Sequence, residues 1–113
     1  MAINSVRRGD GSITEMPLTF GTVKSGEIQG NAAATVLPSI ACTMVNFKAV
    51  ASNAGNVYLG GAGVTKPEGT TDATSGWELD AGQETGWLPV DNLNKFYLIC
   101  DNARDDLVYI SLS

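Results

Sequence analysis

The stretch Val45–Gly61, with the sequence VNFKAVASNAGNVYLGG, limits the possible fold more than any other part of the chain. Its first half alternates apolar and polar side chains with a period of two, which indicates a β-strand with one buried face. The segment Asn53–Asn56 supplies residues that favour a turn, and Val57–Leu59 is a second short strand. The stretch therefore predicts a β-hairpin.

The rest of the chain continues this pattern of short strands separated by turn residues. Further strands are expected over residues 18–23, 32–37, 77–79, 87–90, 95–100 and 107–112. Segment 24–31 is interpreted as a Gly-rich loop and segment 64–75 as a long polar surface loop. About eight short strands without a long helix predict an all-β fold, a single β-sandwich domain. Its topology, jelly-roll-like or Ig-like, is left open.

The strand pattern also predicts the core and the division of the chain. The side chains expected to be buried in one sandwich are Val45, Phe47, Val57, Leu59, Leu98, Cys100, Val108 and Ile110. Leu112 is placed on the same face of the last strand as Val108 and Ile110. Residues 1–30 are expected to form an N-terminal arm and a first strand, and residues 31–113 the sandwich body. Residues 1–16 show no sustained period, so we expect an extended arm that a binding partner orders.

Composition limits the classes of function. The chain has 113 residues, of which 43% are hydrophobic, and no apolar run has the ~20 residues of a membrane span. The basic pair near the N-terminus lacks a following apolar segment, so we expect a cytoplasmic product and not a secreted one. Cys42 and Cys100 are then expected to be reduced, buried thiols. The chain contains no His, which excludes His-based catalytic triads and His-ligated metal sites.

The charge is distributed unevenly. Residues 1–30 carry three basic and three acidic side chains, whereas residues 31–113 carry four basic and nine acidic ones, which accounts for the net charge of −5. Because nucleic-acid binding requires clustered Lys and Arg, the acidic body argues against a nucleic-acid partner.

Three groups of side chains are candidates for chemical sites. Segment 101–106 is rich in carboxylates and is the best candidate for calcium, although a solvated turn is favoured. Glu78, Asp80 and Glu84 are weighed, and disfavoured, as a glycosidase carboxylate pair. Two tryptophans, Trp77 and Trp87, provide a possible stacking surface for a sugar, against the simpler interpretation that both are core or interface aromatics. We expect no cofactor and no enzymatic activity.

The arm and the polar loop carry the candidate contacts with other proteins. Residues 8–10 form an Arg-Gly-Asp tripeptide of the type that integrins recognise, and chance occurrence is the favoured explanation. The arm residues proposed to bind a partner are Ile3, Val6, Arg7, Arg8, Ile13 and Met16. The loop residues proposed as a second contact are Lys66, Glu68, Thr70 and Asp72.

The order of several segments resembles a known family. Leu37-Pro38 and Cys42 are followed by VNFKAVASNAGNVYLGGAGV, then by GWELDAGQETGWLPVDNL and finally by KFYLICDNARDDLVYISL. This layout is similar to that of small virion proteins of tailed bacteriophages, the capsid decoration or cement proteins, over about residues 34–113. The family's Ala-Gly-Asp before the last strand is replaced here by Ala103-Arg104-Asp105.

The resemblance implies a virion protein on the exterior of the capsid, made in the host cytoplasm and without enzymatic activity. It would bind the major capsid protein, bridge neighbouring coat subunits and stabilise the shell. Apart from the resemblance, we expect a homo-oligomer, with a trimer favoured, and contact with neither membrane nor nucleic acid. A carbohydrate- or receptor-binding module of a phage tail or fibre is the alternative.

Overall fold

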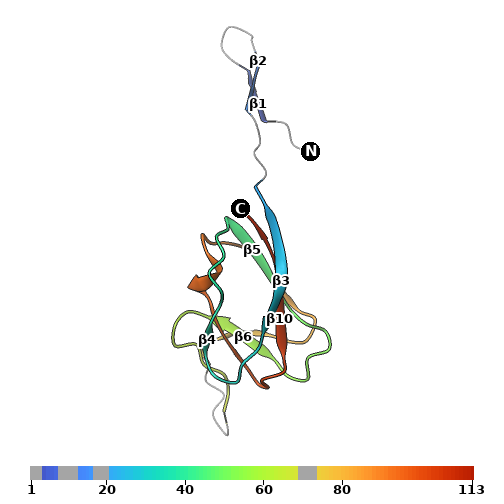
Figure 1. Cartoon of the computed structure of the whole chain (residues 1–113), viewed down its shortest axis with the longest axis vertical. Coiled ribbons are helices and arrows are strands. Elements are labelled where there is room, and N and C mark those ends of the chain that lie inside the picture. Colours follow the sequence, from blue (N-terminus) through green and yellow to red (C-terminus); the bar gives the residue numbers. More distant parts are fainter. Residues whose placement is uncertain (1–3, 8–12, 17–20, 69–73) are drawn as a thin grey trace.

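A computed structural model describes residues 4–7, 13–16, 21–68 and 74–113, the first two ranges by their backbone only (Figure 1). Two strands, β1 (Asn4–Arg7) and β2 (Ile13–Met16), form a separate antiparallel ribbon. The body strands are β3 (Val23–Gln29), β4 (Thr35–Val36), β5 (Met44–Ala49), β6 (Val57–Gly60), β7 (Trp77–Leu79), β8 (Glu84–Pro89), β9 (Tyr97–Cys100) and β10 (Asp106–Leu112). A short 3-10 turn, η1 (Leu93–Lys95), precedes β9. No helix in these ranges is long and apolar enough to cross a membrane.

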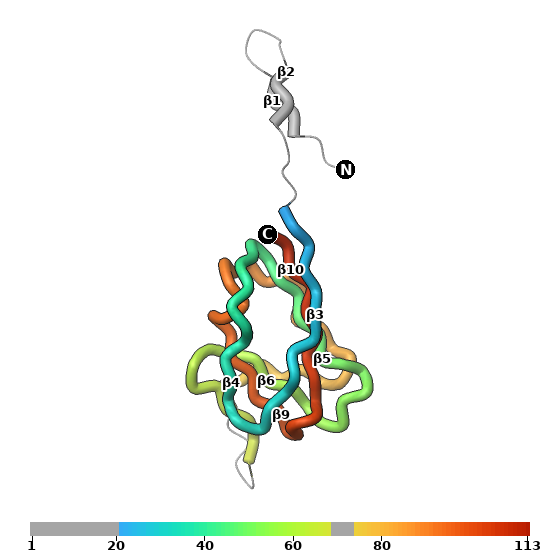
Figure 2. Tube along the Cα trace, viewed as in Figure 1, coloured from blue at the N-terminus to red at the C-terminus, as the bar shows by residue number. Residues whose placement is uncertain are grey.

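The body strands form two antiparallel sheets that pack as a β-sandwich. The first sheet has the order β3-β10-β5-β8 and the second has the order β4-β9-β6-β7. The pairs β3–β10, β4–β9, β5–β8 and β6–β7 are those of one long hairpin folded over on itself. This is the strand arrangement of a jelly roll and differs from the ABED/CFG sheets of an Ig domain. Figure 2 shows the two ends of this long hairpin, β3 and β10, side by side along their lengths.

The core between the sheets confirms most of the sequence prediction. Six of the eight side chains expected there are buried: Val45, Phe47, Val57, Leu59, Leu98 and Cys100. The ring of Phe47 contacts that of Phe96 edge to face, with ring centroids 5.1 Å apart. Strand β9 is buried on both faces, as its continuous apolar run predicts.

The predicted β-hairpin over Val45–Gly61 is wrong, although both of its strands exist. Strand β5 pairs with β10 and β8 in the first sheet, whereas β6 pairs with β9 and β7 in the second. The connection therefore crosses from one sheet to the other. Turn-forming residues allow the chain to reverse, but they do not determine which strand becomes the hydrogen-bonded neighbour.

Segment 24–31 is not a loop, because most of it forms strand β3. Over seven residues β3 pairs with β10 in an unbroken register, from Val23–Leu112 to Gln29–Asp106. Gly26 fits within the strand because the ring of Tyr109 lies over it, 3.1 Å from where a Cβ would be. The strand expected over residues 18–23 falls largely outside the described residues, and its last residue opens β3.

The last strand has the opposite orientation to the one expected. Leu107 is buried and Tyr109 packs against the core, whereas Ile110 is 41% exposed and Val108 is only half-buried. The buried carboxylate of Asp105 fixes this alternation, because its oxygens accept hydrogen bonds from the backbone of residues 54 and 55. When Asp105 points inward, the side chains two and four positions later also point inward.

The N-terminal segment contains regular structure that the sequence did not indicate. Asn4 pairs with Met16 and Arg7 pairs with Ile13, which makes a two-stranded ribbon instead of a single extended chain. Figure 1 shows this ribbon beyond the end of the body where β3 begins. Each strand of the ribbon has only four residues and spans about 13 Å, so its reach is far below the ~50 Å of 16 extended residues.

Candidate interaction surface

The two outer faces of the sandwich differ, because among the described residues a segment of the chain covers the second sheet and none covers the first. The segment after β6 folds over the second sheet, where Val64 packs with Tyr58 and Ile99 in a small second core. Lys66 fastens this segment, because its Nζ donates a hydrogen bond to the carbonyl oxygen of Cys100 at 2.7 Å. Two of the predicted contact residues, Lys66 and Glu68, lie on this cover; Thr70 and Asp72 lie outside the described residues.

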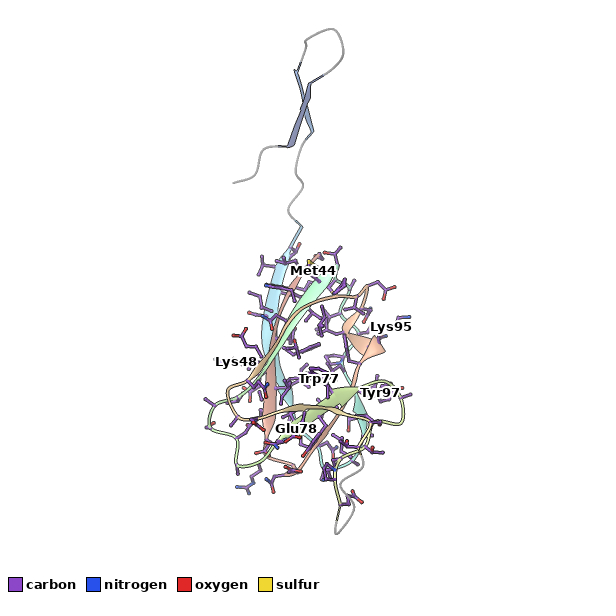
Figure 3. The ribbon with its side chains drawn as sticks, turned by 180° about the vertical axis from the view of Figure 1, so that it is seen from behind. Met44, Lys48, Trp77, Glu78, Lys95 and Tyr97 are labelled. Carbon is purple, nitrogen blue, oxygen red and sulfur yellow. The ribbon has the colours of Figure 1, made fainter. Side chains whose placement is uncertain are left out.

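The outer face of the first sheet carries most of the exposed large apolar side chains of the described chain. One cross-strand row runs over all four strands and consists of Val23, Leu112, Met44 and Pro89. We call these four residues the apolar row. Val23 is 61% exposed, and Leu112 and Met44 are more than one third exposed. Figure 3 shows Met44 at the end of the body nearest the ribbon.

The next row combines apolar and polar groups. Ile110 and Trp87 are both exposed by more than 40% and lie on either side of Asn46. The Nδ2 of Asn46 donates to Glu84 Oε1 at 2.9 Å, whereas its Oδ1 is enclosed without a partner among the described residues. Large apolar patches rimmed by polar residues mark interaction sites on soluble proteins.

The far end of the same face is charged. Glu27, Gln29, Arg104 and Asp106 line a shallow hollow of about 450 Å³. Asp106 raises the pKa of Glu27, first through side-chain hydrogen bonding to the protonated carboxyl and then through its negative charge. The outer face is thus apolar near the ribbon and charged at the opposite end.

The carboxylates of segment 101–106, the disfavoured candidate for a calcium site, accept hydrogen bonds within the protein. The carboxylate of Asp105 is buried and accepts from the backbone N–H groups of Ala54 and Gly55 at 2.9 and 3.0 Å. Asp101 Oδ2 accepts from the N–H of Asn56 at 2.9 Å. In the described part of the chain, no three metal-binding side chains cluster. These carboxylates therefore connect the loop before β6 to the loop before β10.

The two tryptophans do not form one surface. Trp87 belongs to the outer face of the first sheet, whereas Trp77 lines a cavity of about 340 Å³ between the sheets. Trp77 lies near the centre of Figure 3 and is 69% exposed. The other lining residues are Leu59, Gly60, Thr85, Leu88 and Phe96. Thr85 Oγ1 already donates to Gly86 O and accepts from Phe47 N–H, so this apolar cavity suits an apolar group better than a sugar.

The candidate glycosidase carboxylates are also separated. Glu84 pairs with Lys48 on the outer face of the first sheet, and its Oε1 accepts from Asn46. Glu78 is opposite Tyr58 in the second sheet, and its Oε1 accepts from Asn56 Nδ2 at 2.6 Å. Because these positions lie on opposite outer faces of the sandwich, the two carboxylates cannot flank one glycosidic bond.

The arm residues are described by their backbone alone. Val6 and Arg7 belong to β1, and Ile13 and Met16 belong to β2. Ile3 and Arg8, together with the Arg-Gly-Asp tripeptide, lie outside the described residues.

Sequence reasoning missed four of the residues that make the exposed apolar face: Val23, Met44, Ile110 and Leu112. A signal was present in the last strand, because both of its faces carry apolar residues while only one can face the core. Comparison of the chain with protein-family models, curated proteins and solved structures found no match.

Proposed function

We propose that this chain is a non-enzymatic virion protein of a tailed bacteriophage, which binds the outer surface of the capsid and stabilises the shell. Two features support the proposal. The segment layout resembles that of capsid decoration proteins, and the jelly roll leaves one sheet face uncovered while its own loop covers the other. Jelly rolls occur in viral capsid proteins, although a fold alone does not establish a function.

The exposed apolar side chains on the outer face of the first sheet are the observation that carries the proposal. Fully burying one large apolar side chain stabilises a complex by about 1.5–3 kcal/mol, and these side chains are about half-exposed. Burying the five exposed large apolar side chains of this face would therefore contribute roughly 4–6 kcal/mol before the costs of association. These five are Val23, Met44, Trp87, Ile110 and Leu112. A coat protein that presents many identical sites provides a regular surface for such a contact.

The ribbon is proposed to make a second contact, with a neighbouring coat subunit. An isolated two-stranded ribbon is marginally stable, so β1–β2 gains stability when it packs against a partner. The same segment contains the chain's only adjacent basic pair, Arg7-Arg8, while the body is acidic. Attachment through both the face and the ribbon would bridge two coat subunits.

The test measures binding to expanded phage capsids that lack the protein. The double variant Trp87→Ala/Ile110→Ser should bind at least about tenfold more weakly, because it removes two side chains from the proposed contact. Deleting residues 2–16 should also weaken binding while the body keeps its β-type circular dichroism spectrum. Val36→Ser is the matched control, since Val36 is 48% exposed but belongs to the second sheet.

Wild-type affinity of the double variant would refute the outer face as the contact. If the truncated protein binds normally while the double variant does not, the ribbon is not an anchor and the outer face binds without it. Failure of every form to bind capsids, including the wild type, would refute the proposed function.

A receptor-binding module of a tail or fibre is the second candidate, because the exposed Trp77 lines an apolar cavity that suits an apolar group of a receptor. Copy number separates the two functions. A decoration protein is present at hundreds of copies in each particle and a fibre module at a few, so band intensities on a gel of purified particles, compared with the coat protein, decide between them.

A further inference from the structure

The four edge strands of the sandwich differ in how well they are protected against pairing with another strand. Strand β4 has two residues and β7 has three. Strand β8 is interrupted by a bulge, contains Gly86 at φ +80° and ends at Pro89. Short strands, bulges and Pro are the usual means of preventing edge-to-edge association. Strand β3 has seven residues, no Pro and an unbroken register with β10.

The free edge of β3 presents a regular set of backbone groups. Thr22 O accepts from Ser113 N–H at 3.1 Å, so residue 22 directs its backbone groups towards the last strand. Because these directions alternate, residues 24, 26 and 28 also face β10. Val23, Ser25, Glu27 and Gln29 then direct N–H and C=O outwards, where no strand of the described chain pairs with them.

We propose that two copies of this chain pair through β3, antiparallel and with Gly26 on the two-fold axis, so that the two first sheets form one continuous sheet. Each outward-facing residue of one copy then meets one of its partner copy, with Val23 opposite Gln29 and Ser25 opposite Glu27. Four such pairs form about eight backbone hydrogen bonds across the interface. This proposal does not depend on the proposed function, because it concerns the free protein in solution.

Charge and length select this register over its neighbours. A two-fold axis at Glu27 would place two identical carboxylates directly opposite each other, and an axis at Lys24 would do the same with two ammonium groups. An axis at Ser25 avoids like charges but leaves Ile28 and Gln29 outside the paired strand. The axis at Gly26 pairs all seven residues of β3 and opposes no like charges.

The inner side of the strand also fits a second copy. At this register Lys24 is opposite Ile28 of the partner copy. Ile28 is only half-buried, although it packs against the core, and the apolar stem of a lysine can cover such a side chain. Gly26 has no side chain to separate the two strands at the axis, where the ring of Tyr109 already lies over it.

The first test compares Ser25→Pro with Ser25→Ala in the full-length protein. Proline removes one outward-facing N–H, and this group makes no bond within the sandwich, so the body should still fold. Sedimentation equilibrium between micromolar and millimolar concentrations should show a dimer for the wild type. Self-association should be weaker by at least about tenfold in Ser25→Pro and unchanged in Ser25→Ala.

The second test concerns the register. Ser25→Lys places an ammonium group opposite Glu27 of the other copy and should strengthen the dimer, whereas Ser25→Glu should weaken it. If the axis lay at Ser25, both substitutions would place like charges opposite each other and both would weaken the dimer.

Hydrogen exchange followed by NMR provides the readout at the strand itself. The amides of Val23, Ser25, Glu27 and Gln29 should become protected as the protein concentration rises. A monomer at every concentration would overturn the proposal. A trimer in which these four amides stay unprotected would also overturn it, and would support the trimer expected from the sequence. Unchanged dimerisation of Ser25→Pro would exclude the β3 edge as the interface.

Discussion

The carboxylate of Asp105 connects two loops that are about 50 positions apart in the chain. It is 2% exposed, and Asn102 Nδ2 supplies a further donor to Oδ2 at 3.2 Å. The backbone of Gly55 approaches so closely that a Cβ there would lie 2.8 Å from Asn102 Nδ2 and 3.0 Å from Asp105 Oδ2. A buried carboxylate is stable when several donors surround it, and here backbone N–H groups supply most of them.

Replacing Asp105 with Ala should lower the free energy of unfolding by ~2–5 kcal/mol, because two backbone N–H groups lose their acceptors in a buried site. Urea unfolding followed by fluorescence of Trp77 and Trp87 measures the change. Asp101→Ala is the matched control, since the exposed Asp101 accepts a single backbone hydrogen bond. This substitution should lower the free energy of unfolding by about 1 kcal/mol or less. If both variants lose the same free energy of unfolding, the burial of Asp105 does not add to the stability of the fold.

The two thiols should be reduced and unreactive in the folded protein. Cys42 and Cys100 are both buried and not bonded to each other, and burial raises the pKa of each thiol, which leaves little thiolate near neutral pH. Intact-mass measurement after alkylation should show no label on the native protein and two labels in denaturant without reductant. Absence of label in denaturant would indicate a disulfide and contradict the prediction.

At the scale of elements, the Glu27–Asp106 pair makes the contact between β3 and β10 sensitive to pH. The pKa of Glu27 is raised from its ordinary value of 4.5 by the hydrogen bond to Asp106 and by its charge. Between pH 4.5 and the raised pKa of Glu27, the folded state therefore binds more protons than the unfolded state. The free energy of unfolding falls as the pH rises through this range. Below pH 4.5 the stabilisation by the shared proton is fully present.

Glu27→Gln should accordingly be more stable than the wild type near neutral pH, and the difference should shrink as the pH falls through the raised pKa of Glu27 towards 4.5. Chemical denaturation at several pH values measures it. In an Asp106→Asn background the same substitution should have no pH-dependent effect, because the partner charge is gone. A difference that is independent of pH would show that Glu27 and Asp106 do not interact.

The sequence located most strands but not their partners. Alternation in β5 correctly placed Val45 and Phe47 in the core. When one face of a strand is polar and the other apolar, the apolar face must be the buried one. In β10 both faces carry apolar residues, so alternation could not show which face is buried. The buried Asp105 in the preceding turn determines it. Strand β3 was missed because its residues are mostly exposed and polar; its pairing with β10 defines it.

The candidate interaction surface was less predictable than the fold for a related reason. Its apolar row joins residues from four strands, and their adjacency depends on sheet order, which local pattern does not contain. Val23 lies at the end of a predicted strand and Met44 just before another, and neither is unusual by itself. Only the register brings them to either side of Leu112.

At the scale of the whole molecule, the two outer faces of the jelly roll differ in whether their apolar residues are covered. The second sheet is closed by the segment that carries Val64 and Lys66, so its apolar residues stabilise the monomer. The first sheet keeps its apolar row exposed at one end and its carboxyl pair at the other. In the proposed function, the open face is therefore the one that contacts the capsid.

The place of β10 between β3 and β5 has a consequence for synthesis of the protein on the ribosome. This inner strand of the first sheet is translated after all the other described strands. At about 5–20 residues per second, β3 waits roughly 4–15 s for its neighbour. During this time β3 and β5 have no β10 between them, so the nascent chain is expected to need a chaperone to avoid aggregation.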